Sequence, residues 1–264
     1  MRILPLFFCS KNNPAASAAE VTSDNVVGYT KIQLPKNAMT IVGNQFQNIG
    51  ATTMNIQDIT VAGDFDTWGG DWIKFWDPST RTYEIAYYFG EDADGVFAPE
   101  DVDYENSLGA GWGDGDQIIL NLDIDLGQGF WTQSVGGGSL VFSGEVTSNT
   151  EVTVPANKMT LIANPIPQSI NIQDITIAGD FDTWGGDWIK FWDPSTRTYE
   201  IAYYFGEDAD GVFAPEDVDY ENSLGAGWGD GDQIIIDLNI DVGQGFWVQS
   251  VNGGSVIFPT VSAE

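Results

Sequence analysis

Carboxylate side chains dominate residues 90–116, a segment that contains no Lys or Arg. Unpaired carboxylates at this density repel one another, whereas a divalent cation held by several oxygens would draw them together. Calcium suits such a site because it accepts about six to eight oxygen ligands in flexible geometry. We therefore expect calcium sites built from the acidic side chains of this segment and of its second copy, namely Asp92, Asp94, Asp101, Asp103, Glu105, Asp208, Asp210, Asp217, Asp219 and Glu221.

The spacing of these acids differs from that of an EF-hand. If Asp94 is the third ligand of such a loop, the first position falls on Gly90 and the last on Asp101, where an EF-hand has a bidentate Glu. Two alternatives to a calcium loop stay open: a solvated acidic loop and a recognition surface for a basic partner. A second, smaller group that could bind a cation consists of Asp64, Asp66 and Asp71.

Ten Trp residues fall at corresponding positions of two similar halves of the chain. A solvent-facing row of indole rings can stack on sugar rings while neighbouring acids and amides bond the sugar hydroxyls, and indoles also pack well in the cores of small β domains. We expect Trp68 and Trp112, which stand among Gly and Asp residues, to be exposed. The candidate glycan-binding residues are Trp68, Trp72, Trp112, Trp184, Trp188 and Trp228.

The composition disfavours catalysis. The chain has no His, which removes the commonest general base and metal ligand, and its single Cys, Cys9, precedes the first half. A pair of carboxylates could hydrolyse glycosidic bonds, but an abundance of acids does not select two of them. We expect a protein that is not an enzyme and that uses no organic cofactor.

The charge balance also argues against nucleic acid and anionic lipid as partners. Nine Lys and Arg against 39 Asp and Glu give a formal net charge of −30. Such a field repels phosphate backbones and anionic lipid, so we expect neither nucleic-acid binding nor membrane insertion. It attracts cations, and it would also keep the protein soluble.

The elements that position these side chains occur twice. Residues 55–117 and 171–233 are identical except that Val61 is replaced by Ile177. The similarity extends beyond this centre and predicts two modules, residues 20–144 and 145–264, each large enough to fold alone. Residues 1–19 are either a signal peptide or a disordered leader, since an apolar run after Arg2 is followed by small residues.

The local patterns indicate strands. Apolar residues alternate with polar ones in residues 118–126, and residues 72–76 and 82–89 flank a turn sequence that begins Asp77-Pro78. Short strands between Gly-rich turns, without a long amphipathic helix, predict an all-β chain. We expect two tandem, near-identical antiparallel β-sandwich or barrel-like domains.

Three segments, residues 40–46, 75–83 and 127–133, resemble a β-rich module of bacterial secreted and cell-surface proteins that reads GNPF, DPxTxTY and GQGFW in order. The resemblance covers most of each half but not the acidic segment. It implies an exported β-sandwich with structural, adhesive or accessory roles, and it transfers no catalytic residue.

These observations lead to two hypotheses. The first is a non-enzymatic extracellular tandem-repeat protein with a structural, adhesive or assembly role at a bacterial surface, stabilised by calcium and associating with itself head-to-tail as an oligomer or filament. The alternative is a calcium-dependent carbohydrate-binding protein whose two equivalent sites bind an extracellular glycan with avidity.

Overall fold

The computed structural model describes residues 27–66, 68–90, 110–116, 118–147, 151–181, 184–205, 227–232 and 234–260. The protein is all-β, as predicted. The helices among these residues are two short 3-10 turns, η1 (Ile56–Asp58) and η4 (Ile172–Asp174). Neither has the length and apolarity that crossing a membrane requires.

The strands of module 1 are β1 (Val27–Leu34), β2 (Met39–Gly43), β3 (Thr53–Asn55), β4 (Thr60–Ala62), β5 (Trp68–Asp77), β6 (Thr82–Phe89), β7 (Gly111–Gly113), β8 (Asp123–Asp125), β9 (Gly129–Gln133) and β10 (Gly138–Glu145). Those of module 2 are β11 (Glu151–Val154), β12 (Lys158–Ala163), β13 (Ile170–Asn171), β14 (Thr176–Ala178), β15 (Trp184–Asp193), β16 (Thr198–Phe205), β17 (Gly227–Gly229), β18 (Asn239–Ile240), β19 (Gly245–Ser250) and β20 (Gly254–Ile257).

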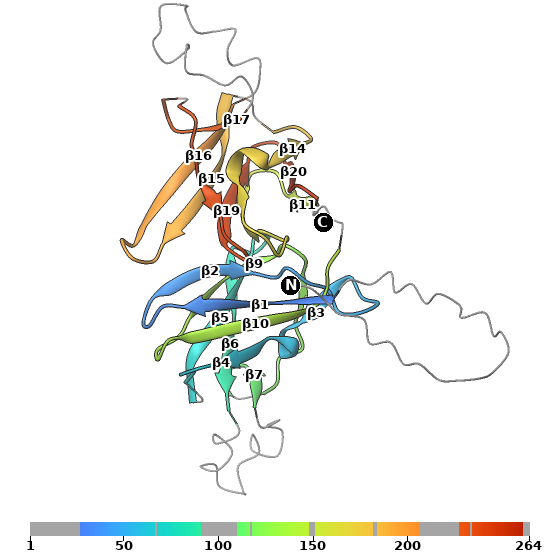
Figure 1. The fold of residues 1–264 in the computed structure, drawn as a ribbon, viewed down its shortest axis with the longest axis vertical. Coiled ribbons are helices and arrows are strands. Elements are labelled where there is room, and N and C mark those ends of the chain that lie inside the picture. Colours follow the sequence, from blue (N-terminus) through green and yellow to red (C-terminus); the bar gives the residue numbers. More distant parts are fainter. Residues whose placement is uncertain are drawn as a thin grey trace, which may run out of the picture.

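Each module is sandwich-like. In module 1 a three-stranded sheet, β1-β10-β4, faces a five-stranded sheet, β2-β9-β5-β6-β7, and β3 pairs with β8. Module 2 repeats this with β11-β20-β14, β12-β19-β15-β16-β17 and β13-β18. In Figure 1 the blue-to-green module 1 occupies the lower half and the yellow-to-red module 2 the upper half, with β2, β9 and β19 near the middle.

The expected hairpin is present. Strands β5 and β6 pair antiparallel up to Asp77 opposite Thr82. The Asp77 carboxylate accepts hydrogen bonds from the Ser79 backbone N–H at 2.7 Å and from the Thr80 hydroxyl at 2.8 Å. Arg81 closes the turn at φ +60, donating its N–H to the Asp77 carbonyl at 2.9 Å. The short-range bonds of the Asp-Pro-Ser-Thr sequence therefore specify this turn.

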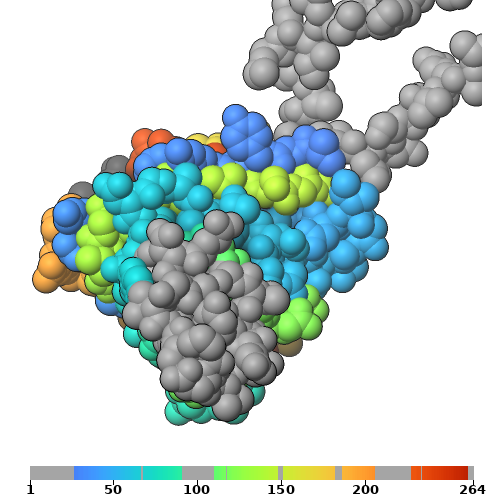
Figure 2. Space-filling view, turned by 90° about the horizontal axis from the view of Figure 1, so that it is seen from below, coloured from blue at the N-terminus to red at the C-terminus, as the bar shows by residue number. Residues whose placement is uncertain are grey.

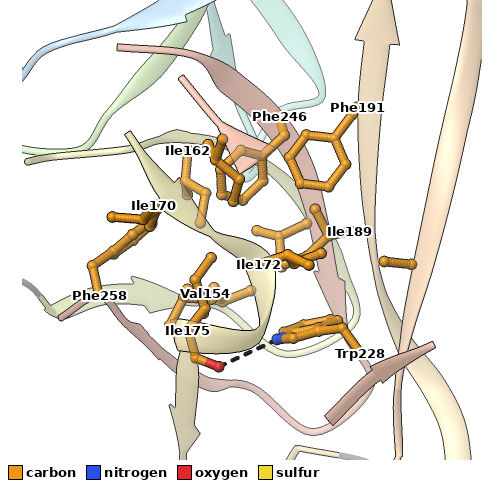
Figure 3. Close-up of a cluster of buried hydrophobic side chains, with 14 of the residues drawn as sticks. Val154, Ile162, Ile170, Ile172, Ile175, Ile189, Phe191, Trp228, Phe246 and Phe258 are labelled. Carbon is orange, nitrogen blue, oxygen red and sulfur yellow. Dashed lines mark hydrogen bonds between the residues drawn. The ribbon is translucent and has the colours of Figure 1, made fainter. Parts of the chain in front are cut away.

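The core of each module lies between its two larger sheets. In module 2 the three-stranded sheet contributes Val154 and Val256, and the five-stranded sheet contributes Ile189 and Phe246 (Figure 3). Trp228 lies at one end of this core and donates its indole N–H to the Ile175 carbonyl at 3.3 Å. Burial of such large apolar side chains is the main stabilising contribution in each module.

The alternating segment 118–126 forms less strand than its pattern predicts. Only Asp123–Asp125 pairs as a strand, with β3. Upstream, the Gln57 side chain donates to the carbonyls of Trp112 at 2.6 Å and Leu120 at 2.7 Å. This amide adds to the short backbone pairing with β7, in which the Leu120 N–H donates to the Trp112 carbonyl at 3.1 Å and Gly113 is bridged to Ile119.

Strand β1 lies at an edge of module 1. It pairs with β10 over eight positions, from Val27 opposite Glu145 to Leu34 opposite Gly138. Figure 2 shows these two strands side by side in blue and yellow-green, with the cyan surface of module 1 below them and part of module 2, in orange, behind the edge.

Candidate functional site

Both faces of each five-stranded sheet are apolar near the middle of the molecule. In β5, Ile73 and Phe75 point into the core of module 1, so Trp72 and Trp76 point to the other face. Strand β9 alternates in the same way. The outer face of this sheet is therefore not a solvent face but one that another surface must cover.

Module 2 covers it. Ile41 and Trp131 of module 1 form a buried cluster with Leu161 and Trp247 of module 2, each 3–6% exposed. Four partly buried indoles pack around this cluster: Trp72, Trp76, Trp188 and Trp192. We call this contact the junction.

Hydrogen bonds across the junction occur in matched pairs. The Trp76 indole N–H donates to the Met159 carbonyl at 2.7 Å, and the Trp192 indole N–H donates to the Met39 carbonyl at 2.8 Å. Because each bond recurs with the modules exchanged, the junction is isologous: the same patch of each module meets its counterpart about an approximate two-fold axis.

The backbones meet in the same manner. The Gly43 N–H donates to the Gly243 carbonyl at 3.0 Å, and the Ala163 N–H donates to the Gly127 carbonyl at 2.8 Å. Gly127 and Gly243 have φ values of +72 and +65, which favour glycine. These bonds extend the antiparallel pairing from one module into the other.

The second glycine of each Gly-Gln-Gly motif permits this approach. A Cβ at Gly129 would lie 2.5 Å from the Ile162 carbonyl oxygen, and one at Gly245 would lie 2.5 Å from the Ile41 side chain. The Gly-Gln-Gly motif is thus a contact motif between modules.

Gly43 and Ala163 occupy equivalent positions and meet at the axis. A Cβ at Gly43 would lie 2.3 Å from the Ala163 Cβ, closer than two carbon atoms can approach without displacement. One of the two positions must therefore lack a side chain. The sequence difference between the modules here removes a clash that identical alanines would create.

Aromatic rings link the two modules further. Trp76 packs against Tyr83 with ring centres 5.0 Å apart and edge-on against Trp247 at 5.6 Å. In the matching arrangement Trp192 packs against Tyr199 at 5.0 Å and edge-on against Trp131 at 5.5 Å. Burial raises the pKa of both tyrosines above its ordinary value.

Two lysines occupy the ring faces beside the junction. The Lys74 ammonium lies 4.1 Å from the centre of the Trp72 ring, and the Lys190 ammonium lies 4.0 Å from that of Trp188. Each pair is a cation–π contact. A sugar ring stacking on that face of Trp72 or Trp188 would have to displace the lysine.

The other candidate indoles have different positions. The expectation that Trp112 is exposed is wrong: Trp112 and Trp228 are 1% exposed, and the Trp112 indole N–H donates to the Ile59 carbonyl at 3.0 Å. An indole in this position is a core residue that no ligand reaches. Trp68 is 51% exposed and lies opposite Phe89, where β6 ends. The side chain of Trp184 is outside the described residues.

All ten acidic residues of the predicted calcium sites also lie outside the described residues. Within the described part of the chain, no group of three or more acids or other metal ligands is placed to hold a metal ion. Asp71, from the smaller acidic group, is fully buried and accepts hydrogen bonds from the Ser134 hydroxyl at 2.7 Å and the Val135 N–H at 2.5 Å. Its carboxylate fastens β5 to the chain after β9 and does not serve as a cation ligand.

Sequence reasoning favoured a head-to-tail contact between modules and missed this two-fold junction. The available signal was the pair of strands 41–42 and 130–131, which are apolar on both faces although each belongs to a sheet of a small sandwich. No family model matches this chain, and no similar curated protein or solved structure was found in the comparisons with known proteins.

Proposed function

We propose that the protein is non-enzymatic and extracellular, and that it has a structural, adhesive or assembly role at a bacterial surface. The supporting observation is the junction, which joins two copies of one module into a single body through buried indoles and paired backbone bonds. Joining two equal modules about a two-fold axis presents two equal ends, and an object with two equal ends is suited to bridging.

The ends are the positions at which the acidic segments join the described strands. Phe89 pairs with Gly111, so residues 90–110 connect two neighbouring strand ends of module 1. The same holds for Phe205 and Gly227 in module 2. In Figure 1, β7 lies at the lower end of the molecule and β17 at the upper end. We call these two places the poles.

Association between chains would use the poles. An isologous contact closes on itself, so the junction is already occupied within each chain and does not extend to the next. A filament therefore needs a second contact, and because the two poles of each chain are equal, this contact joins pole to pole and is not head-to-tail. Calcium shared by carboxylates would overcome their mutual repulsion in such a contact.

The test is sedimentation velocity of the full chain with EDTA, with millimolar calcium and with millimolar magnesium. We expect particles larger than one chain with calcium alone. A variant with Asp92→Asn and Asp94→Asn keeps one intact pole, so it should stop at pairs of chains. Adding Asp208→Asn and Asp210→Asn should leave single chains.

If calcium still produces particles larger than one chain after all four substitutions, assembly through the acidic poles is contradicted. Single chains under every condition would contradict self-assembly altogether. Thermal unfolding in the same buffers separates calcium binding from assembly, because a cation that binds the native state at a hundredfold excess over its Kd stabilises it by about 2.7 kcal/mol.

The alternative function, calcium-dependent carbohydrate binding, is favoured by one specific observation. The half-exposed ring of Trp68 lies at the pole of module 1, opposite the last residue of β6. An exposed indole beside a cation site is an arrangement that could bind a sugar ring and its hydroxyls together.

A glycan array with and without calcium tests this alternative. Calcium-dependent binding that Trp68→Ala weakens and Trp68→Phe largely keeps would support it. Binding that is absent, or that is equal in EDTA, would exclude a calcium-dependent site at the poles.

A further inference from the structure

A cleft of about 330 Å³ opens beside the junction, between the tip of the β5–β6 hairpin and the start of β12. Its walls come from both modules, so it exists only when the junction is formed. The lining includes Trp76 and Arg81 from module 1 and Asn157, Lys158, Met159 and Gln249 from module 2. The volume falls in the range of small-ligand pockets, about 300–1,000 Å³.

The charge of this cleft is opposite to that of the chain. The formal net charge is −30 with nine Lys and Arg in all, yet Arg81 and Lys158 both line the cleft and no carboxylate does. Within the described residues the structure records no ion pair for either cation. Asp77, at the start of the same turn, accepts hydrogen bonds from Ser79 and Thr80 and does not line the cleft. Two cations are thus available for an anionic ligand.

Two residues that line the cleft have left-handed backbone conformations. Arg81 and Asn157 line the cleft with φ values of +60 and +55. The left-handed region is routine for Gly and tolerated by Asn, but it is uncommon for Arg. Arg197 has a φ value of +58 at the equivalent position, so this conformation is common to both hairpins and does not distinguish the cleft.

The uncharged groups suit a sugar ring. Trp76 donates its indole N–H to the Met159 carbonyl, which fixes the indole at the wall of the cleft and leaves an apolar surface beside Met159. Asn157 and Gln249 bring carboxamides, which can both donate to and accept from hydroxyls. An aromatic ring, amides and two cations together match a sugar that carries a carboxylate.

We propose that this cleft binds a hexuronate residue of an acidic saccharide, with Arg81 and Lys158 at its carboxylate, Trp76 and Met159 against its ring, and Asn157 and Gln249 at its hydroxyls. The site is distinct from the poles and needs no calcium. It goes beyond the proposed function and does not rest on it.

The approximate symmetry provides a matched control. The corresponding positions on the other side of the junction hold Trp192, Arg197, Asn37 and Met39, but Ala38 stands where Lys158 would be. The second position therefore has one cation fewer. We expect one dominant site per chain, and we expect Arg81→Ala and Arg197→Ala to have unequal effects.

The net negative charge does not prevent binding at ordinary ionic strength. At 0.15 M salt the Debye length is about 8 Å, so most carboxylates of the chain are screened from the cleft while contacts within it are not. The measurement is isothermal titration of the full chain with trigalacturonate at this salt concentration in EDTA. Neutral galactotriose and sodium acetate are titrated in parallel as controls.

We expect one site per chain for trigalacturonate and no measurable binding of galactotriose or acetate. Arg81→Ala and Lys158→Ala should each weaken binding at least about tenfold, because hydrogen bonds to charged groups contribute that factor or more. Arg81→Lys should weaken it less, and Arg197→Ala should leave it nearly unchanged. Thermal unfolding of each variant checks that it is folded.

Three results would overturn the proposal: no binding of trigalacturonate, equal binding of acetate or galactotriose, or equal losses from Arg81→Ala and Arg197→Ala. Because the titration is done in EDTA, its outcome is independent of calcium-dependent assembly or glycan binding at the poles. Failure of either proposal therefore leaves the other standing.

Discussion

The five-stranded sheets of the two modules have the same strand order and matching register, but the first strands of the modules differ in length. Strand β1 of module 1 pairs over eight residues with β10, whereas β11 of module 2 pairs over four with β20. The position after Phe142 is Ser143, and the position after Phe258 is Pro259, a residue that is poorly tolerated inside a sheet.

Module 1 also uses the connecting chain. Glu145, the last residue of β10, exchanges backbone hydrogen bonds with Gln47 at 2.8 and 3.2 Å. The corresponding segment of module 2 reads Ile166-Pro167, and Pro167 has no N–H to contribute. Matched positions of the two modules therefore form the core and the junction, while residues that differ between the modules determine how each one ends.

The largest effect on stability is expected at the approximate two-fold axis of the junction. Gly43→Ala would place a Cβ 2.3 Å from the Ala163 Cβ and 2.5 Å from the Gln128 carbonyl oxygen. Overpacking of this kind costs on the order of 1–3 kcal/mol or more. Chemical denaturation should show the loss, and small-angle scattering should show whether the modules separate.

Ala163→Gly is the matched control for this substitution and should cost about 1 kcal/mol or less. The double variant, Gly43→Ala with Ala163→Gly, shows which of these two contacts causes the loss of stability. Recovery of most of the stability would assign the loss to the contact with Ala163, between modules. No recovery would assign it to Gln128, within module 1, and would contradict an axis that requires unlike residues.

A smaller and symmetric effect is expected at the indoles. Trp76→Phe and Trp192→Phe each remove one indole N–H that donates across the junction and leave a carbonyl without that donor. Each should lower the free energy of unfolding by about 1–2 kcal/mol. Values for the two variants that differ by much more than the measurement error would argue against the isologous junction.

A local effect is expected at the strand that differs between modules. Ser143→Pro would give module 1 the residue that follows Phe258 in module 2 and should shorten the β1–β10 ladder. We expect loss of amide exchange protection in residues 27–30, because proline fixes φ and is poorly tolerated inside a sheet. Retained protection would mean that proline is not what ends the ladder in module 2.

The smallest effect is the pH dependence of stability that comes from the two hairpin tips, and it should be equal in the two modules. Hydrogen bonds from Ser79 and Thr80, and from Ser195 and Thr196, lower the pKa of Asp77 and Asp193 from 3.8 to about 2. Since the folded-state pKa is the lower one, the stabilisation is present above about pH 4 and is lost as the pH falls towards 2. Carboxyl titration followed by NMR should give two similar low values. Ser79→Ala should raise only that of Asp77.

Local signals predicted the elements well. The hairpin from β5 to β6 was predictable because Asp77, Pro78 and the residues after them specify their turn through short-range bonds. Trp112 was predicted wrongly because Gly and Asp neighbours are typical of exposed loops. Its burial depends on the Ile59 carbonyl, more than fifty residues away, and no local pattern contains that information.

The sequence by itself determined that the chain is all-β, that it contains one module twice and that acidic segments recur at matching places. These properties follow from alternation, turn chemistry and identity, which are read along the chain. Only the tertiary structure decided that the outer faces of the five-stranded sheets cover each other, that Gly43 must oppose Ala163, and that Arg81 and Lys158 line one cleft. Alternation divides a strand into two faces, but the surface that covers each face is decided by packing between residues far apart in the chain.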